Sequence, residues 1–264
     1  MKLPFFQVDA FADAPFSGNS AAVMPLDAWL DDATLQAIAM ENNLSETAFT
    51  IADASGEADF ELRWFTPTTE VALCGHATLA TGHVVLDAGG ADQVKFRTRK
   101  AGILSVERDG EGYALSLPPT LVAPHFDPEL LKALGIGDGE VFHSVSGAEA
   151  TSIVLVADEA GVRSVAPDMR ALAAHDVMAI VTAPGTATDV VSRVFVPAWG
   201  VDEDPVTGSA HAALAPFWAE RLGRDAFTAW QASTRGGRVD CRLADNRVIL
   251  TGRCVTVIEG VMRL

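Results

Sequence analysis

Two glycine-led turns, one in each half of the chain, hold the residues best suited to chemistry. Cys74-Gly-His-Ala77 and Thr207-Gly-Ser-Ala210 each open a run of small apolar residues that predicts a buried helix. The first turn of a helix leaves backbone N–H groups without internal partners, and the helix dipole adds positive charge there. One such turn is often used for packing alone. Two that face one cleft can hold a carboxylate or stabilise an enolate-like anion.

Three titratable side chains near these turns are candidates for proton transfer. Glu46 precedes an apolar strand in a segment dense in Asn and Ser, which predicts an ordered, hydrogen-bonded turn. An acid at the entry to a buried strand is a candidate general base. His76 is a candidate proton shuttle, because the unperturbed pKa of a histidine side chain is near neutrality. Asp204 could orient a protonated partner or a substrate amine. Each has a simpler alternative: a surface carboxylate at a strand end, a buried or capping histidine, and an acidic complement to the helix dipole.

Cys74 and Asn19 offer weaker signals. A thiolate is favoured just before an amide-rich turn, yet the counterpart of Cys74 is Thr207, so racemisation through paired cysteines lacks one of its two bases. Asn19, in a Gly-Asn-Ser turn, either binds substrate or closes the turn. Arg235 lies in a glycine-rich segment, where a hairpin is a simpler role than carboxylate binding. The sequence contains no phosphate-binding or dinucleotide fingerprint, no nucleophile elbow and no His/Asp cluster with metal-ligand spacing.

The elements that must position these residues are short strands interrupted by a few helices. Acidic and apolar spacing predicts an amphipathic helix over Asp31–Glu41, and the two apolar runs predict helices from about Gly75 to Leu86 and from about Ser209 to Leu222. Met169–Ala174 predicts a further short helix. Short apolar or alternating runs rich in strand formers predict strands. These runs are Leu3–Phe11, Ala21–Met24, Thr47–Ala52, Asp59–Thr66, Val94–Thr98, Ile103–Glu107, Tyr113–Leu117, Ile153–Ala157, Val177–Ala183, Val190–Pro197, Phe227–Ala232, Val239–Leu243, Val248–Thr251 and Val255–Glu259.

A proline cluster divides the chain. Pro118-Pro119, followed by Pro124 and Pro128, removes backbone donors and restricts its neighbours, which predicts a linker between domains. The predicted domains are therefore an N-terminal lobe over residues 1–118 and a C-terminal lobe over residues 119–264. The pattern leaves open whether the last residues return to the first lobe.

The order of motifs repeats across this boundary. Arg63-Trp-Phe-Thr-Pro67 parallels Arg193-Val-Phe-Val-Pro197, and each precedes one of the glycine-led turns. The proline and the glycine lie eight residues apart in the first half and eleven in the second, so a duplication with a three-residue insertion accounts for the repeat. Both helices are apolar nearly all round and must be enclosed on every side. The predicted fold is α+β: two pseudo-symmetric lobes, each an antiparallel β-sheet or barrel wrapped around a central helix, with a cleft between them.

Composition limits the class of protein. The chain has 264 residues, of which 49% are hydrophobic and 20% charged, so it can bury a sizeable core. A formal net charge of −16 argues against binding to nucleic acid or to anionic membranes. Three cysteines are too few for a disulfide scaffold, and neither a signal-peptide pattern nor a membrane-spanning run is present. We therefore expect a soluble protein of a reducing, cytoplasmic compartment.

The motifs together resemble the phenazine-biosynthesis-like PhzF proteins, in order and over nearly the whole chain. The resemblance is carried by Phe6-Gln-Val-Asp-Ala-Phe11, Ser17-Gly-Asn-Ser-Ala-Ala-Val23, Asn43-Leu-Ser-Glu-Thr-Ala-Phe49, Arg63-Trp-Phe-Thr-Pro67, Cys74-Gly-His-Ala-Thr-Leu-Ala80 and Gly200-Val-Asp-Glu-Asp-Pro-Val-Thr-Gly-Ser-Ala-His211. It implies the diaminopimelate-epimerase fold and a homodimer. It also implies an isomerase that needs no cofactor and no metal. In the namesake reaction, trans-2,3-dihydro-3-hydroxyanthranilate loses a proton at one ring carbon and regains one at another.

The resemblance also implies a role for each matching residue. Glu46 is the general acid/base, while His76 and Asp204 position the substrate and assist the proton relay. The substrate-binding residues are Ser209, Gly75, Gly208, Ser45 and Asn19, with the two glycines supplying backbone amides. The substrate implied is a small carboxylic acid held in the cleft, where closure of the lobes excludes water.

Two departures from the PhzF pattern bear on the alternatives. Ser20 follows Asn19 where the family usually has proline, which changes the rigidity of a turn. Cys74 matches the first thiol of the epimerase branch, but Thr207 stands where that branch has its second. The isomerase is therefore preferred. A racemase or epimerase of amino or hydroxy acids that uses Cys74 with Glu46, and a binding protein without turnover, are the alternatives.

Overall fold

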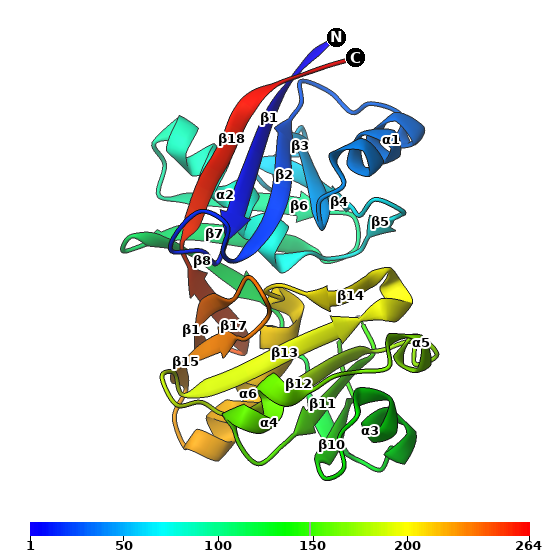
Figure 1. Ribbon diagram of the computed structural model, residues 1–264. Coiled ribbons are helices and arrows are strands. Elements are labelled where there is room, and N and C mark those ends of the chain that lie inside the picture. The colour runs from blue at the N-terminus through cyan, green and yellow to red at the C-terminus, as the bar shows by residue number, and fades with distance from the viewer. Residues whose placement is uncertain (148) are drawn as a thin grey trace. The chain divides into compact units, whose positions relative to one another are not determined.

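The computed structural model describes residues 1–147 and 149–264, and the chain divides into two compact units (Figure 1). The first unit comprises Met1–Ser116 together with Thr251–Leu264, and the second comprises Leu117–Leu250. The division falls after residue 116, where the sequence predicted it after 118. The final segment belongs to the first unit because its strand pairs along the length of the N-terminal strand, from Lys2 with Arg263 to Ala10 with Cys254.

The first unit is a sheet with two helices. Its strands and helices are β1 (Lys2–Ala10), β2 (Asn19–Pro25), α1 (Asp32–Asn42), β3 (Glu46–Ala52), β4 (Phe60–Phe65), β5 (Glu70–Val71), α2 (Gly75–Gly89), β6 (Gln93–Thr98), β7 (Ile103–Asp109), β8 (Gly112–Leu117) and β18 (Cys254–Arg263). The strand order is β18-β1-β2-β3-β4-β6-β7-β8, and β5 pairs with β4 beyond the stretch that pairs with β6.

The second unit repeats this plan. Its strands and helices are β9 (Val122–His125), α3 (Pro128–Leu134), β10 (Glu140–Ser144), β11 (Thr151–Leu155), α4 (Glu159–Ser164), α5 (Met169–Leu172), β12 (Met178–Pro184), β13 (Val190–Val196), the 3₁₀ turn η1 (Pro197–Trp199), β14 (Val201–Asp204), α6 (Gly208–Leu222), β15 (Ala226–Gln231), β16 (Gly237–Ala244) and β17 (Arg247–Gly252). The order β9-β10-β11-β12-β13-β15-β16 matches that of the first unit, and β14 lies beside β13 as β5 lies beside β4.

Both sheets are mixed, whereas the sequence analysis expected antiparallel ones. β2–β3 and β4–β6 are parallel in the first unit, as are β11–β12 and β13–β15 in the second. In each case one or two helices lie between the two strands along the chain. A parallel pair requires such a crossover because the chain must return to the same edge before the second strand begins.

The two long helices are enclosed, as their sequences require. In α2 the buried positions include Ala77, Leu79, Ala80 and Leu86, which point in different directions around the helix. The helix packs closely against β7, because a Cβ at Gly82 would overlap the side chain of Val106. In α6 the buried positions likewise run nearly all round, from Gly208 to Ala219. None of the helices in the described part of the chain is both long and apolar enough to cross a membrane.

An arginine–glutamate pair recurs at the same place in both units and supports the duplication. Arg63 of β4 binds Glu70 of β5 through Nε and Nη2 at 2.8 and 2.9 Å. Arg193 of β13 binds Glu203 of β14 through the same atoms at 2.7 and 2.9 Å. Each guanidinium also lies 4.9 Å from the ring of the phenylalanine two residues further on. Two-point binding of this kind fixes the hairpin that leads to each glycine-led turn.

The proline cluster is not simply a linker. Val122–His125 forms β9, which pairs with β10 even though it contains Pro124. Proline is tolerated at this place because β9 lies at an edge of the pairings described for this unit. Pro128 opens α3 with Asp127 as its N-cap, where a missing N–H costs nothing. The predicted helices otherwise agree with α1, α2, α5 and α6 to within three residues at each end.

Candidate active site

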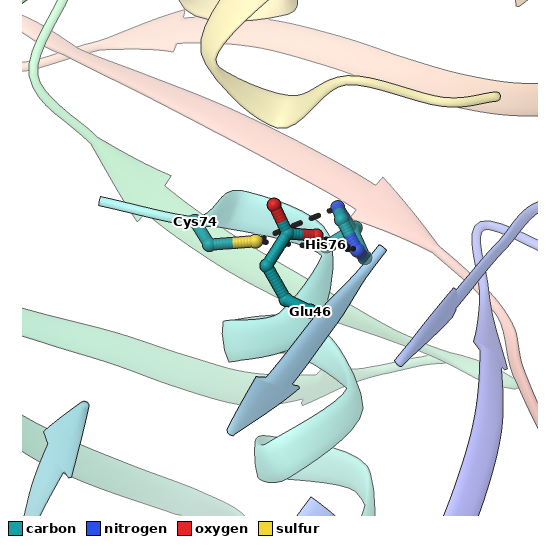
Figure 2. A group of neighbouring side chains, drawn as sticks. All are labelled: Glu46, Cys74 and His76. Carbon is teal, nitrogen blue, oxygen red and sulfur yellow. Dashed lines mark hydrogen bonds and ion pairs between the residues drawn. The ribbon is translucent and has the colours of Figure 1, made fainter. Parts of the chain in front are cut away.

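Three side chains of the first unit, Glu46, Cys74 and His76, converge at the start of α2 (Figure 2). Oε2 of Glu46 lies 3.0 Å from Nε2 of His76. Sγ of Cys74 lies 3.5 Å from Nδ1 and 4.0 Å from Nε2 of the same ring. The cysteine and the histidine are buried, whereas 17% of the Glu46 side chain is exposed. A ligand arriving from solvent therefore meets the carboxylate of this group first.

The turn before Glu46 is ordered, as its Asn and Ser content predicted. Asn43 ends α1 in the left-handed conformation, with φ of 49°, and its N–H binds the carbonyl of Ala39 at 3.1 Å. The side chain of Asn42 donates to Oγ1 of Thr47 at 3.0 Å. β3 then begins at Glu46 and pairs in parallel with β2 from Ala21. The carboxylate is thus held at the first position of a strand that is anchored on both sides.

A chain of hydrogen bonds orients His76. Oγ of Ser45 donates to Oδ1 of Asn19 at 3.0 Å, which places the amide nitrogen of Asn19 against Nδ1 of His76 at 3.1 Å. An amide nitrogen only donates, so Nδ1 is the acceptor and the ring proton lies on Nε2, next to Glu46. Asn19 is fully buried. The contacts described for Asn19 and Ser45 therefore support a positioning role for both, where the sequence analysis expected them to bind substrate.

The carboxylate keeps hydrogen-bonding capacity for a ligand. Oε2 of Glu46 is buried and, within the described residues, accepts no hydrogen bond of good geometry, although Nε2 of His76 lies close to it. A buried carboxylate oxygen without such a bond is energetically costly, and functional sites are where this cost recurs. The atom is available to take a proton from, or return one to, a bound molecule.

The start of α2 adds positive potential beside these groups. Cys74 occupies the N-cap in an extended conformation but makes no capping hydrogen bond with its side chain, and Gly75 begins the helix. The N–H of Thr78 donates to the carbonyl of Cys74, which is the bond that closes the first turn of the helix. The amides of the first turn and the helix dipole therefore favour an anion at this end of α2.

The predicted residues of the second unit gather at the corresponding end of α6. Thr207 is the N-cap, Gly208 begins the helix, and Ser209 follows with its hydroxyl 3.8 Å from Sδ of Met178. The hydroxyl of Thr207 donates to Oδ2 of Asp204. Of the predicted site residues, Glu46, His76, Gly75, Ser45 and Asn19 thus lie together in the first unit, and Asp204, Gly208 and Ser209 lie together in the second.

Gln231 is a site-supporting residue that the sequence analysis did not single out. Its side chain is fully buried and binds three groups around the start of α6: it accepts from the N–H of Thr207 at 2.9 Å, and it donates to the carbonyl of Asp204 at 2.7 Å and to Oγ1 of Thr207 at 3.1 Å. A glutamine that ends the alternating strand Ala226–Gln231 was the available signal, because such a residue is rarely buried without a specific partner.

His211 of α6 is a fully buried histidine that burial keeps neutral. Its Nδ1 donates to the carbonyl of Thr207 at 2.8 Å, and its Nε2 has no hydrogen-bond partner among the described residues. Loss of hydration lowers the pKa of His211 from 6.5 to about 4, against the opposing effect of the Thr207 carbonyl. The unfolded chain therefore binds a proton at this position that the folded chain excludes.

The stability of the protein is expected to fall between pH 6.5 and pH 4 because of His211. The folded pKa lies below the unfolded one, so the contribution is complete above pH 6.5 and is lost by about pH 4, to a total of about 3 kcal/mol. The free energy of unfolding, measured in urea at several pH values, should depend less steeply on pH over this range in His211→Asn than in the wild type. Asparagine keeps a hydrogen-bond donor but does not titrate. The exposed His125→Gln is the control, and an unchanged slope in His211→Asn would contradict the assignment.

Glu46, Cys74 and His76 are also the residues of the described chain best placed to hold a metal ion. One donor atom from each lies within 4.8 Å of the other two, and no second group of this kind is found among the described residues. The set combines thiol, imidazole and carboxylate, which are the ligands of zinc.

Comparisons with known proteins agree with this fold. The chain matches the family model described as phenazine biosynthesis-like protein, PhzC-PhzF, over residues 8–260. It is 47% identical to a protein of Pseudomonas aeruginosa named as an uncharacterized isomerase, and the match covers all of both chains. A crystal structure of a PhzF-family protein from Enterococcus faecalis superposes with a TM-score of 0.90 at 41% identity, again over the whole of both chains.

A more distant structure extends the likeness of fold. A hydroxyproline epimerase from Agrobacterium vitis matches with a TM-score of 0.65 at 14% identity, over 98% of this chain and 92% of that one. The predicted α+β fold of epimerase type is confirmed by these matches. The extent of the family match and the relatives along the full chain lead to one assignment: this chain belongs to the phenazine biosynthesis-like, or PhzF, family.

Proposed function

We propose that the protein is an isomerase that moves a proton between two carbons of a small carboxylic acid, with Glu46 as the acid/base and without help from a cofactor or a metal. The observation that carries the proposal is the buried Oε2 of Glu46, which accepts no hydrogen bond of good geometry from the described residues and lies 3.0 Å from Nε2 of His76. Several relatives are named as isomerases, which supports isomerisation as the class of reaction.

The proposed reaction needs one base that first accepts and then returns a proton. The carboxylate of Glu46 takes a proton from a substrate carbon that adjoins the unsaturated part of the acid, and the negative charge is delocalised over the substrate. The same carboxyl group then delivers the proton to a second carbon of the substrate. The amides at the start of α2 stabilise the anionic form. His76, held by Asn19 with its proton on Nε2, presents that N–H toward the carboxylate of Glu46.

The residues of the second unit are proposed to complete the binding set. Asp204 is suited to orient a polar group of the substrate, because its carboxylate is itself held by the hydroxyl of Thr207. Ser209 and the amide of Gly208, at the start of α6, are proposed to bind the substrate carboxylate. A substrate related to trans-2,3-dihydro-3-hydroxyanthranilate, a homodimer and a cytoplasmic location remain predictions from the family resemblance.

One observation favours a second candidate, a racemase or epimerase. Sγ of Cys74 lies at the start of α2 within 3.5 Å of the His76 ring, where a thiolate would be stabilised. In that reaction Cys74 and Glu46 would act on the same carbon of an amino or hydroxy acid. The matching position of the second unit is Thr207, whose hydroxyl is already bound to Asp204, so a second thiol base is lacking there.

Proton exchange in D₂O distinguishes these reactions. The wild-type protein should be incubated with a panel of unsaturated, amino and β-hydroxy carboxylic acids and followed by NMR. Deuterium at a carbon other than the one that lost its proton indicates the isomerase, while deuterium at the same carbon with inversion indicates the racemase. Ligand shifts without exchange for any member of the panel would favour a binding protein.

Cys74→Ser is expected to keep the rate of the isomerisation within about 10-fold of the wild-type value, because the thiol contacts His76 but is not the proposed acid/base. The similar volume of serine leaves α2 in place. The same deuterium-exchange rates measure the effect, and Cys254→Ser serves as the control at a half-buried cysteine outside the group of Glu46, Cys74 and His76. A loss of about 10²-fold or more in Cys74→Ser alone would indicate the racemase instead.

A further inference from the structure

We propose that Glu46, Cys74 and His76 form a binding site for one thiophilic divalent metal ion, of which Zn²⁺ is the representative, and that the bound ion blocks proton transfer. Metal binding is independent of the reaction proposed above. Only its consequence, inhibition, rests on the proposed role of Glu46.

The donor atoms already stand near the separations that a zinc ion requires. Zinc bonds of about 2.3 Å to sulfur and about 2.1 Å to nitrogen and oxygen, at tetrahedral angles, separate the ligand atoms by about 3.4 to 3.6 Å. Nε2 of His76 is 3.0 Å from Oε2 of Glu46 and 4.0 Å from Sγ of Cys74. Shifts of about half an ångström, within the reach of side-chain rotation, bring both distances to these values.

Burial and unused bonding capacity favour the ion at this point. Cys74 and His76 are 6% and 3% exposed, so two ligands are fixed in a dry environment, and the partly exposed Glu46 side chain lies on the route of entry. Oε2 of Glu46 is buried and accepts no hydrogen bond from the described residues. Metal coordination uses a lone pair of this oxygen that no well-aligned hydrogen bond from the described residues occupies, which offsets the cost of burying it.

The residues behind His76 can adapt to the ion. In the apoprotein the amide of Asn19 donates to Nδ1 of His76, so the ring proton is on Nε2. When Nε2 binds the metal, this proton moves to Nδ1, and a flip of the Asn19 amide presents Oδ1 to accept it. Oγ of Ser45 can then accept from the amide nitrogen, because a hydroxyl both donates and accepts. A histidine ligand held from behind in this way is the usual arrangement in zinc sites.

The proton balance is simple. Cys74 binds as the thiolate and releases its proton to solvent, while the proton of His76 stays on the ring and Glu46 binds as the carboxylate. The protein then contributes three ligands, and water takes the fourth position. Because the ion occupies the lone pair of Glu46 that accepts the substrate proton, the metal-bound protein cannot run the proposed reaction.

The test is a titration of the tag-free, chelator-treated protein with Co²⁺. This ion binds at zinc sites, and a thiolate ligand gives it a charge-transfer absorption band. No substrate is present, so the result does not depend on the proposed function. We expect the band to saturate at one equivalent and to be displaced by Zn²⁺. Cys74→Ser should abolish the band, and Cys254→Ser should leave it unchanged.

A second variant, Glu46→Gln, keeps the test valid if Cys74→Ser loses the band only because it misfolds. Glu46→Gln should weaken Co²⁺ binding by at least ~10-fold while retaining the thiolate band, since loss of even an outer-shell partner costs this much. Circular dichroism checks that each variant is folded. The proposal is overturned if the folded wild-type protein shows no saturable thiolate band, if the band survives in Cys74→Ser, or if Glu46→Gln binds as tightly as the wild type.

Discussion

Replacing Glu46 with glutamine is expected to lower the rate of proton transfer by about 10² to 10⁴-fold, which is the range that a positioned general acid/base contributes. Glutamine has the same size and can still face Nε2 of His76, 3.0 Å from the carboxylate oxygen in the wild-type protein, but it cannot accept and return a proton at neutral pH. The measurement is the rate of deuterium incorporation from D₂O into whichever acid of the panel the wild-type protein labels.

The matched control is Glu41→Gln, an exposed glutamate near the end of α1 that precedes the same turn. It should exchange at the wild-type rate. Binding of the labelled acid to Glu46→Gln, followed by ligand NMR shifts, should persist because the amides at the start of α2 are untouched. Exchange at the wild-type rate in Glu46→Gln would contradict the assignment of Glu46 as the acid/base and would make Cys74 the next candidate.

Gly18→Ala is expected to destabilise the fold by at least ~3 kcal/mol, the largest stability effect that we predict for a single methyl group. Gly18 has φ of +66°, and a Cβ there would overlap the carbonyl oxygen of Ala10 and lie 2.9 Å from Cβ of Ala12. The obstacle is backbone, which cannot rotate away. Because Asn19 is the next residue, the displacement should also disturb the orientation of His76. Urea unfolding and the exchange rate measure the two consequences.

Gly56→Ala separates backbone conformation from steric overlap. Gly56 also has positive φ, +78°, but a Cβ at this position would have no atom of the described residues within 4 Å apart from its own chain neighbours. This variant should therefore cost only about 1–2 kcal/mol, the penalty of the left-handed conformation itself. Equal losses of stability in the two variants would show that the contact with Ala10 carries no cost.

Much of the fold could be predicted from residue patterns because those patterns act locally. The apolar circumference of α2 and α6 required enclosure, and the repeat of Arg63 and Arg193 before each glycine-led turn indicated duplication. In the structure the repeat has a physical cause, since each arginine binds a glutamate of the following strand. Glu46 and His76 could be placed in one site only through the family resemblance of their motifs, because 30 positions separate them along the chain.

What could not be predicted depends on contacts between distant parts of the chain. The parallel pairs, such as β2 with β3, arise from where each crossover returns, which no short pattern records. Asn19 and His76 are 57 positions apart, and only their hydrogen bond reveals that Asn19 orients the ring. The strand and helix in the proline cluster were missed because Pro124 and Pro128 occupy the two kinds of position that tolerate proline, an edge strand and the first turn of a helix.

The pairing of β1 with β18 has a consequence for biosynthesis. A ribosome releases the chain from its amino end, and domains usually fold in that order. The second unit is continuous in sequence and can fold as soon as Leu250 has emerged, whereas the first must wait for Thr251–Leu264. Until then the β1 edge that faces β18 is unpaired and open to association with other nascent chains. The part of the protein made first is therefore the part completed last, and its exposure to chaperones is set by the rate of translation.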